Sequence, residues 1–420
     1  MTTTRPPLTR MLLVSLTIGW ACLSLILTPE AVLAQRTRTE APIDFVQAFD
    51  TLQKCVQANF YDKNLHGVNW REVRERYAPK VAQIKTKHAF TQMVNQMLDE
   101  LKASHAELLT SDDFGYYLLR AVLSGDIDKP QVTHIGIVGK YDKDDFIITG
   151  VLDGGPAATA GIQLGDRLRL VGNEPFHSIS SFHDQEGKPL TITLQRVGEP
   201  QTRTITVTPK KENLLRSFLD ATRKSARVFV VEGKRIGYIH LWTMGHELFK
   251  QLVDQLVLGQ LYNTEGLILD LRDGFGGNPS GFADVFFTPD VLWQQDSRGV
   301  QTTRRFGYGK PMVVLTNAGT RSAKEFLSYQ FKRSSRATLV GTTTAGAFLG
   351  ATSFPIVPGI MLELPIVGLT LDGIRLEAKG VAPDILVETL FPYTDKDDQI
   401  LKAKQVLLSK ILSSKRVLLH

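Results

Sequence analysis

The sequence predicts a multidomain α/β protein. Between residues 43 and 103, apolar side chains recur every three or four positions, which is the spacing of helices that bury one face. Residues 131–209 contain short alternating apolar runs separated by glycine-rich turns, a pattern typical of β-strands. From residue 236 onward, strand-like apolar runs alternate with helical segments, which indicates an α/β core around a central sheet.

Composition narrows the class further. The 420 residues suggest two or three domains, and 43% hydrophobic and 22% charged residues are typical of a soluble globular protein. The formal net charge of +6 is mild, and no motif combines basic with aromatic residues, so we expect no nucleic-acid partner. Cys55 is the only cysteine after residue 34, so an internal disulfide is not expected in the mature chain. The sequence has no cysteine cluster and its histidines are scattered, which argues against a metal site. We also expect no cofactor.

The N-terminus has the layout of a secretory signal peptide. Two arginines precede the apolar run Met11–Leu27, and Val32 and Ala34 provide small residues before a cleavage site at Gln35. We therefore expect residues 1–34 to be removed from an exported, periplasmic or extracytoplasmic protein without stable membrane insertion. An uncleaved anchor is the alternative, although the run is short for a membrane span. A lipoprotein site at Cys22 is disfavoured because the residues before it form a poor lipobox.

The first structural unit, residues 43–128, is expected to be helical. Its third helix leads into the segment LDELKASHAEL, which contains His105. A lone histidine in such a place is more often structural than functional. Its ordinary pKa is nevertheless suited to taking a proton from a hydroxyl near neutral pH.

The predicted core spans residues 211–395 and contains two turns that could take part in binding or catalysis. An apolar strand at Gly266–Leu271 runs into the glycine-rich turn RDGFGGN, and glycine allows a backbone to approach a ligand closely. A phosphate loop is disfavoured there because no G-K-[ST] follows. A second strand, Met312–Leu315, is followed by a turn and then by Ser322 at the start of a helix. There the hydroxyl lies near free N–H groups that can hold a developing anion, although a lone serine at such a position is more often a simple helix cap.

This second turn, GTRSAKE, with its following helix, strand and V-G-x-x-T-x-G loop, resembles the nucleophile region of the C-terminal processing (tail-specific) peptidases and their tricorn-core-like relatives. The resemblance extends over nearly all of the mature chain and implies a ClpP/crotonase-like core. It implies that Ser322 is the nucleophile and that the N–H of Ala323 binds the oxyanion. The second oxyanion donor would be Gly276 or Gly277, and the resemblance does not separate them.

The string GPAATAGIQLGD, within residues 131–210, resembles a PDZ domain of the circularly permuted protease type. PDZ domains bind a peptide as an added edge strand and hold its terminal carboxylate with backbone N–H groups. The resemblance implies that Ile135, Gly136 and Ile137 belong to the carboxylate-binding loop. The alternative is a PDZ domain that only packs against the protease and gates it.

One departure from the family pattern bears on the mechanism. The Ser–Lys branch carries its basic lysine 25 positions after the serine, where this chain has Ala347. Lys324 is a poor substitute, because side chains two positions apart on a helix do not face each other. The tricorn-like branch uses a histidine oriented by a glutamate just before a G-V-x-P-D motif, and Glu377 and His105 match those positions. The resemblance thus implies a Ser322–His105–Glu377 site, unless Glu377 is a surface residue.

We therefore expect a secreted serine endopeptidase that acts on exported proteins or peptides, with C-termini recognised by the PDZ domain. An inactive PDZ-containing pseudoprotease that binds protein tails is the first alternative, since the lysine is absent. A ligand-binding relative is the second, because a retinoid-binding branch shares the fold. The C-terminal residues 396–420 are expected to form a helix that packs on the core. The sequence does not give the substrate or the oligomeric state.

Overall fold

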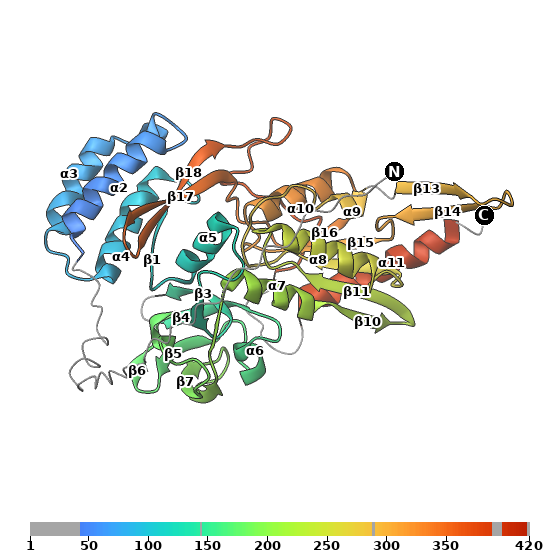
Figure 1. The fold of residues 1–420 in the computed structure, drawn as a ribbon, viewed down its shortest axis with the longest axis horizontal. Helices are drawn as coiled ribbons and strands as arrows, with labels where there is room; N and C mark the ends of the chain where they lie inside the picture. The colour runs from blue at the N-terminus through green and yellow to red at the C-terminus, as the bar shows by residue number, and fades with distance from the viewer. Residues whose placement is uncertain (1–42, 143–144, 288–289, 389–396, 418–420) are drawn as a thin grey trace, which may run out of the picture. The chain divides into compact units, whose positions relative to one another are not determined.

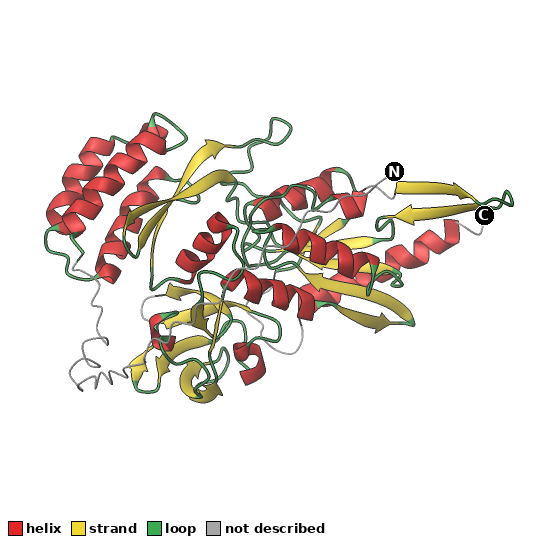
Figure 2. Ribbon diagram, viewed as in Figure 1, coloured by secondary structure: helices red, strands yellow, loops and turns green. Residues whose placement is uncertain are grey.

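The computed structural model describes residues 43–142, 145–287, 290–388 and 397–417. The expected signal peptide lies outside these ranges. Within them, no helix combines the length and the hydropathy needed to cross a membrane. The described chain forms an N-terminal region, a β domain and an α/β core, which confirms the expected fold class (Figure 1, Figure 2).

The N-terminal region begins with three amphipathic helices, α2 (Phe45–Asn59), α3 (Trp70–Val81) and α4 (Lys87–Leu98). Each begins after a residue whose side chain accepts backbone N–H groups of the first turn, namely Asp44, Asn69 and Thr86. The connecting 3-10 turns are η1 (Leu65–Gly67) and η2 (Asp99–Leu101). A further helix, α5 (Phe114–Ser124), ends at Gly125, whose φ of 63° favours glycine.

A three-stranded antiparallel sheet completes this region with strands from distant parts of the chain. Its order is β1 (Glu107–Thr110), β18 (Ile360–Gly368) and β17 (Leu349–Val357). Helix α2 contacts β17 and β18, and α4 contacts β1. The residues that precede β1 are thereby brought beside segments that follow the core.

The β domain is one antiparallel sheet closed by short elements. Its strand order is β3 (Ile137–Asp142), β4 (Asp145–Val151), β5 (Arg167–Val171), β7 (Leu190–Gln195) and β8 (Thr202–Val207), and β6 (Glu174–Pro175) pairs with β5. The remaining elements are β2 (Val132–His134), β9 (Lys210–Glu212), α6 (Pro156–Ala160) and η3 (Ser180–Phe182). In β7 the alternate residues Ile192 and Leu194 are buried, as expected for a strand with one covered face. Strand β3 is an edge of this sheet.

The core is built on a six-stranded sheet of order β10 (Arg227–Val231), β11 (Lys234–His240), β12 (Gly266–Asp270), β15 (Met312–Thr316), β16 (Thr338–Gly341) and β19 (Ile385–Leu386). All neighbours are parallel except the β10–β11 hairpin. The helices of the core are α7 (Leu214–Ser225), α8 (Glu247–Leu258), α9 (Asp284–Phe287), α10 (Ala323–Arg333) and α11 (Asp398–Val417). A separate hairpin is formed by β13 (Asp290–Gln295) and β14 (Gln301–Phe306).

Both faces of the central sheet are covered. In β12, Leu267 and Leu269 pack with residues of α7, α8 and α10, whereas Ile268 between them packs with α11 residues such as Leu407. Successive side chains of a strand point to opposite faces, so helices on both sides explain why the strand is apolar throughout. The predicted C-terminal helix is present as α11 and lies on the core.

The site is positioned by the carboxyl ends of the parallel strands. The glycine-rich turn follows β12, the turn with Ser322 follows β15, and a loop at residues 342–348 follows β16. Ligands of such sheets bind at these ends, where the loops meet.

Candidate active site

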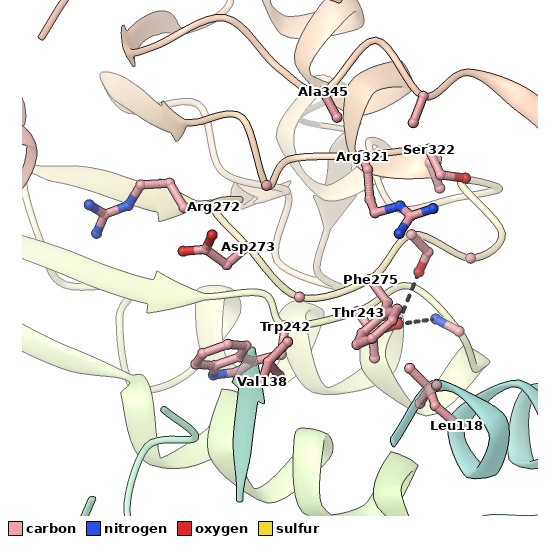
Figure 3. Close-up of a pocket in the computed structure, with 18 of the residues that line it drawn as sticks. Leu118, Val138, Trp242, Thr243, Arg272, Asp273, Phe275, Arg321, Ser322 and Ala345 are labelled. Carbon is pink, nitrogen blue, oxygen red and sulfur yellow. Dashed lines mark hydrogen bonds between the residues drawn. The ribbon is translucent and has the colours of Figure 1, made fainter. Parts of the chain in front are cut away.

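A cavity of about 1640 Å³ lies where the three regions of the described chain meet (Figure 3). His105 lines it from the N-terminal region, Val138 from β3 of the β domain, and Gly276 and Ser322 from the core. Leu118 of α5 adds an apolar wall. The predicted histidine and serine therefore lie in one cavity, although no hydrogen bond joins them in the described structure.

Ser322 has a strained backbone. Its φ of 57° and ψ of −127° place a residue with a Cβ in a region that such residues rarely adopt. Its N–H is held at two acceptors, the carbonyl of Ala347 at 3.0 Å and Oε2 of Glu325 at 3.2 Å. A strained residue persists only where its surroundings fix it, and strained positions gather at functional sites.

Glu325 is the residue that organises the loop around Ser322, and it was missed by the sequence analysis. Its buried carboxylate accepts hydrogen bonds from the hydroxyl of Thr344 at 2.6 Å and from the N–H groups of Gly346 and Ala347 at 2.7 and 2.8 Å. Burial raises the pKa of Glu325, and these hydrogen bonds oppose that shift. The S-x-x-E spacing from Ser322 was the available signal, since it is the pattern of a capping box.

Gly276 and Gly277 differ in what their backbones face. A Cβ placed on Gly276 would lie 2.8 Å from Oγ of Ser322 and 3.0 Å from the nitrogen of Ala323, so only glycine fits against the serine. Gly277, with φ of 133°, instead packs on the backbone of Met244. The carbonyl of Gly276 accepts hydrogen bonds from the N–H of Met244 at 2.8 Å and from Thr243 Oγ1 at 2.9 Å. Of the two glycines, Gly276 is the one that faces Ser322.

Lys324 supports the glycine-rich turn from below. Its Nζ donates a hydrogen bond to the carbonyl of Asp273 at 2.7 Å, and it would lie 3.1 Å from a Cβ on Gly274. Burial lowers the pKa of this lysine to about 7. The position that carries lysine in the Ser–Lys branch is Ala347, whose backbone only helps to hold Ser322 and Glu325.

A hydrogen-bond chain reaches His105 from behind. Nδ1 of His105 lies 2.9 Å from Oγ of Ser104, and that hydroxyl donates to Oε2 of Glu377 at 3.0 Å. Glu377 is buried and also accepts the N–H of Ser104 at 2.9 Å and that of Phe348 at 2.6 Å. Glu377 therefore contacts the imidazole through Ser104 and not directly. Ser104 was missed, although it stands beside His105 in the S-H-A segment.

His105 is held in its neutral form. Burial, followed by the nearby positive charge of Arg321, lowers the pKa of His105 from 6.5 to about 3. Because Ser104 donates its only proton to Glu377, it accepts one from Nδ1 of His105. Nε2 is then unprotonated and able to accept a proton.

The expected carboxylate-binding residues of the β domain do not line the cavity. Ile135 and Ile137 are buried in the core of the domain, and the N–H of Gly136 donates to Nδ1 of His134 at 3.0 Å. The next residues on the same strand, 138–141, line the cavity instead. The edge of β3 thus borders the space that contains Ser322.

A loop of the β domain is fastened to the segment beside the glycine-rich turn. Oδ2 of Asp153 accepts a hydrogen bond from Nε1 of Trp242 at 3.1 Å, and Lys224 Nζ donates to the carbonyl of Gly154 at 3.0 Å. The carbonyl of Trp242 in turn accepts the N–H of Phe275 at 2.9 Å. A short path of hydrogen bonds therefore connects the β domain with the turn that contains Gly276.

A buried ion pair fixes the end of β12. Burial alone would raise the pKa of Asp270, but Arg272 outweighs that effect and lowers it. Tyr238 donates to the same carboxylate at 2.8 Å, and Arg272 also bonds Gln399 at the start of α11 at 3.0 Å. This network anchors the strand from which the glycine-rich turn emerges.

Comparison with known protein families matches three segments of this chain. Residues 235–387 match the model of peptidase family S41, residues 43–99 the tricorn protease C1 domain, and residues 126–187 the PDZ domain. Together they include parts of all three regions described above.

Curated relatives are similar in sequence. The tricorn protease of Thermoplasma volcanium is 26% identical over 379 residues, which is 82% of this chain and 34% of that protein. The carboxyl-terminal-processing protease of Synechocystis sp. is 24% identical over 355 residues, 80% of this chain and 79% of that protein. A chloroplastic carboxyl-terminal-processing peptidase of Arabidopsis thaliana is 25% identical over 386 residues, which is 86% of this chain and 71% of that protein. The chain thus spans about a third of the tricorn protease that it matches.

Solved structures share the fold. A photosystem II D1 C-terminal processing protease aligns with a TM-score of 0.52 and 22% identity over 82% of this chain and 94% of that one. The tricorn protease aligns with a TM-score of 0.53 and 21% identity over 87% of this chain and 37% of that one. The S41 core, the tricorn-type N-terminal segment and the PDZ domain occur here in one chain. The core of this chain therefore matches peptidase family S41, residues 126–187 match a PDZ domain, and the chain is similar in sequence and fold to C-terminal processing and tricorn proteases.

Proposed function

We propose that this protein is an endopeptidase in which Ser322 is the nucleophile and His105 the general base. Ser104 and Glu377 orient the imidazole. The observation that carries the proposal is the hydrogen-bond chain from Glu377 through Ser104 to His105, which ends in the cavity that Ser322 lines. Such a chain fixes the tautomer that a base needs.

The reaction follows the pattern of acyl transfer. Oγ of Ser322 attacks the peptide carbonyl while its proton passes to Nε2 of His105. His105 then gives this proton to the nitrogen of the leaving segment as the C–N bond breaks. A water molecule, deprotonated in the same way, hydrolyses the acyl-enzyme and restores Ser322.

The oxyanion would be bound by two backbone N–H groups, those of Ala323 and Gly276. Ala323 is the first residue of α10, where N–H groups are free of intrahelical partners. Gly276 supports the second assignment because it faces Ser322 and the nitrogen of Ala323. Preorganised donors of this kind usually contribute the largest part of the stabilisation of the transition state.

The PDZ domain is proposed to present polypeptide tails to this site. Its edge strand β3 borders the cavity through residues 138–141, so a chain that pairs with β3 would enter the space beside Ser322. The substrates would be exported proteins, cleaved near their C-termini. Export itself is inferred from residues 1–34.

Active-site labelling tests this proposal. The chain without residues 1–34 is treated with a fluorophosphonate, and its intact mass is measured beside that of Ser322→Ala, His105→Ala and the control Ser334→Ala, an exposed serine at the end of α10. We expect one label on the parent and the control, and none on the other two.

Label that persists in His105→Ala would mean that another base serves Ser322. A parent that takes no label, even with tail peptides present, and that cleaves no peptide would overturn the proposal. It would favour an inactive protein that only binds tails.

A further inference from the structure

Arg321, the residue before the proposed nucleophile, is a charged group in the cavity without a bonded partner. Its half-buried side chain extends into the cavity beside Ser322 (Figure 3). Among the residues that the structure describes, none forms a hydrogen bond or an ion pair with its guanidinium. A guanidinium has five N–H donors in a fixed planar arrangement, and leaving them unsatisfied in a partly enclosed site is unfavourable. The arrangement is therefore suited to a group that arrives from outside.

The surroundings of Arg321 define where that group would be bound. Arg321 and His105 line the same cavity, and the positive charge of Arg321, after burial, lowers the pKa of His105. Burial raises the pKa of Glu107 and of Glu363, the latter to about 7. The positive charge of Arg321 opposes this shift in both residues. These two carboxyl groups are direct cross-strand neighbours on β1 and β18 and both line the cavity. Arg321 thus shares the cavity with these two carboxyl groups.

The side of the scissile bond follows from the role of His105. The base that took the serine proton must deliver it to the nitrogen of the leaving segment, so this segment passes His105. Arg321 lines the same cavity as His105 and directly precedes Ser322, so its side chain can reach this segment. An extended peptide advances about 3.3 Å per residue, and consecutive Cα atoms are about 3.8 Å apart. A side chain next to the nucleophile therefore reaches only the first one or two residues of the leaving segment.

We propose that Arg321 binds a carboxylate in the first or second residue of the leaving segment. This inference rests on the proposed function. The carboxylate is either the α-carboxylate of a chain that ends there or the side chain of Asp or Glu. Arginine pairs with carboxylates through two parallel hydrogen bonds, which adds direction to the attraction.

The test uses matched peptides that share one cleavable sequence. One set ends one, two or four residues after the scissile bond, each as the free acid and as the C-terminal amide. A second set keeps the amide and carries Glu or Gln in the first or second leaving position. The ratio of kcat/KM for acid over neutral substrate is measured for the parent, Arg321→Gln, Arg321→Lys and the control Arg298→Gln, which alters an exposed arginine of the β13–β14 turn.

We expect the parent and the control to prefer the acid by about tenfold or more when the carboxylate is one or two residues from the bond, as for a charge-assisted hydrogen bond. The preference should vanish for the four-residue leaving segment. In Arg321→Gln the ratio should fall to about one, and Arg321→Lys should keep part of it because lysine retains the charge without the planar donors. Removing Arg321 also alters His105, but that change affects acid and neutral substrates alike and cancels in the ratio.

The two peptide sets identify the source of the carboxylate. A preference confined to free C-termini assigns the site to chain ends, and one that also occurs with Glu assigns it to carboxylates in general. A parent that cleaves both kinds equally well, or a ratio that survives Arg321→Gln, would overturn the inference while the peptidase assignment stands. A parent that cleaves no peptide and takes no fluorophosphonate label would instead overturn the proposed function, and the inference with it.

Discussion

The hydroxyl of Ser104 decides which nitrogen of His105 carries a proton. An ionised Glu377 only accepts hydrogen bonds, so Ser104 donates to it and must accept from Nδ1 of His105. Glu377 therefore acts on the imidazole indirectly, through the Ser104 hydroxyl, which has a single proton. Any change that reverses the direction of the Ser104 hydroxyl also reverses the tautomer of His105.

Glu377→Gln should make this reversal. The amide can donate to Ser104, whose proton then turns to Nδ1 and leaves the histidine proton on Nε2, the nitrogen that must be free. We expect kcat to fall by about 10³- to 10⁴-fold with little change in KM, as for other bases held in the wrong tautomer. Steady-state kinetics beside the exposed control Glu75→Gln measures this. A loss of less than tenfold would show that Glu377 serves only packing.

The lowered pKa of His105 has consequences for the pH dependence. Burial and then Arg321 lower this pKa from 6.5 to about 3, so the base should remain neutral, and the acid limb of kcat/KM should lie well below pH 6.5. Arg321→Gln should move the limb to higher pH, because one of the two causes is removed. A pH–rate profile of the parent with its midpoint at the ordinary histidine value would contradict this expectation.

The lowered pKa of His105 also makes the stability of the fold depend on pH. Between about pH 3 and 6.5 the unfolded chain binds a proton that the folded His105 does not, so the free energy of unfolding should fall as pH drops through this range. The buried His134, whose pKa is also lowered to about 3 by burial, contributes with the same sign. Denaturant unfolding at several pH values should show a weaker dependence in His105→Gln than in the parent.

Among the structural elements, the first turn of α10 connects Ser322 with the loop that follows β16. Glu325 there joins the strained Ser322 to the loop after β16 by accepting four hydrogen bonds from Ser322, Thr344, Gly346 and Ala347. A helix cap is normally a local device. Here it also sets the shape of the loop that Ser322 contacts.

Glu325→Ala would leave these donors buried without an acceptor. We expect a loss of about 3–5 kcal/mol in the free energy of unfolding, as for removal of one partner from a buried charged network. Glu247→Ala is the matched control, since Glu247 lies in the first turn of α8 but is exposed, and it should cost less than about 1 kcal/mol. Thermal and denaturant unfolding of both variants gives the comparison. Equal losses would mean that Glu325 is an ordinary helix cap.

Sequence periodicity predicts elements well where burial is one-sided and local. The spacing from Phe45 to Phe60 gives α2, and the class of fold follows from the alternation of strands and helices. Pairings between distant segments carry no such signal. The pairing of β1 with β18, more than 200 positions later, depends on tertiary packing, which the local pattern does not encode. The same limit explains why Ser322, His105 and Glu377 were predicted only through family resemblance, whereas their hydrogen-bond partners Ser104 and Glu325 were missed.

At the level of the whole molecule, the PDZ domain and the glycine-rich turn are connected through Trp242. Its indole donates to Asp153 of the PDZ domain, and its carbonyl holds Phe275 beside Gly276. Arg227 and His240 lie 3.8 and 3.9 Å from the same carboxylate. The position of the PDZ domain is therefore linked to the backbone that is proposed to bind the oxyanion.

Asp153→Ala should release this link. We expect kcat to fall by about tenfold, because small displacements of an oxyanion donor are costly, while peptide binding to the PDZ domain is retained. Kinetics and peptide titration are compared with Asp184→Ala, which alters an exposed carboxylate of the same domain. An unchanged kcat in Asp153→Ala would show that the domain docks without influencing the turn.

The bond between Ser104 and Glu377 joins residues that are 273 positions apart. Synthesis delivers the histidine early, the serine much later and the glutamate last. If His105 is the base, as proposed, a nascent or shortened polypeptide that lacks Glu377 would have no oriented base. In the proposed mechanism, the peptidase would therefore become active only once the chain is complete and folded.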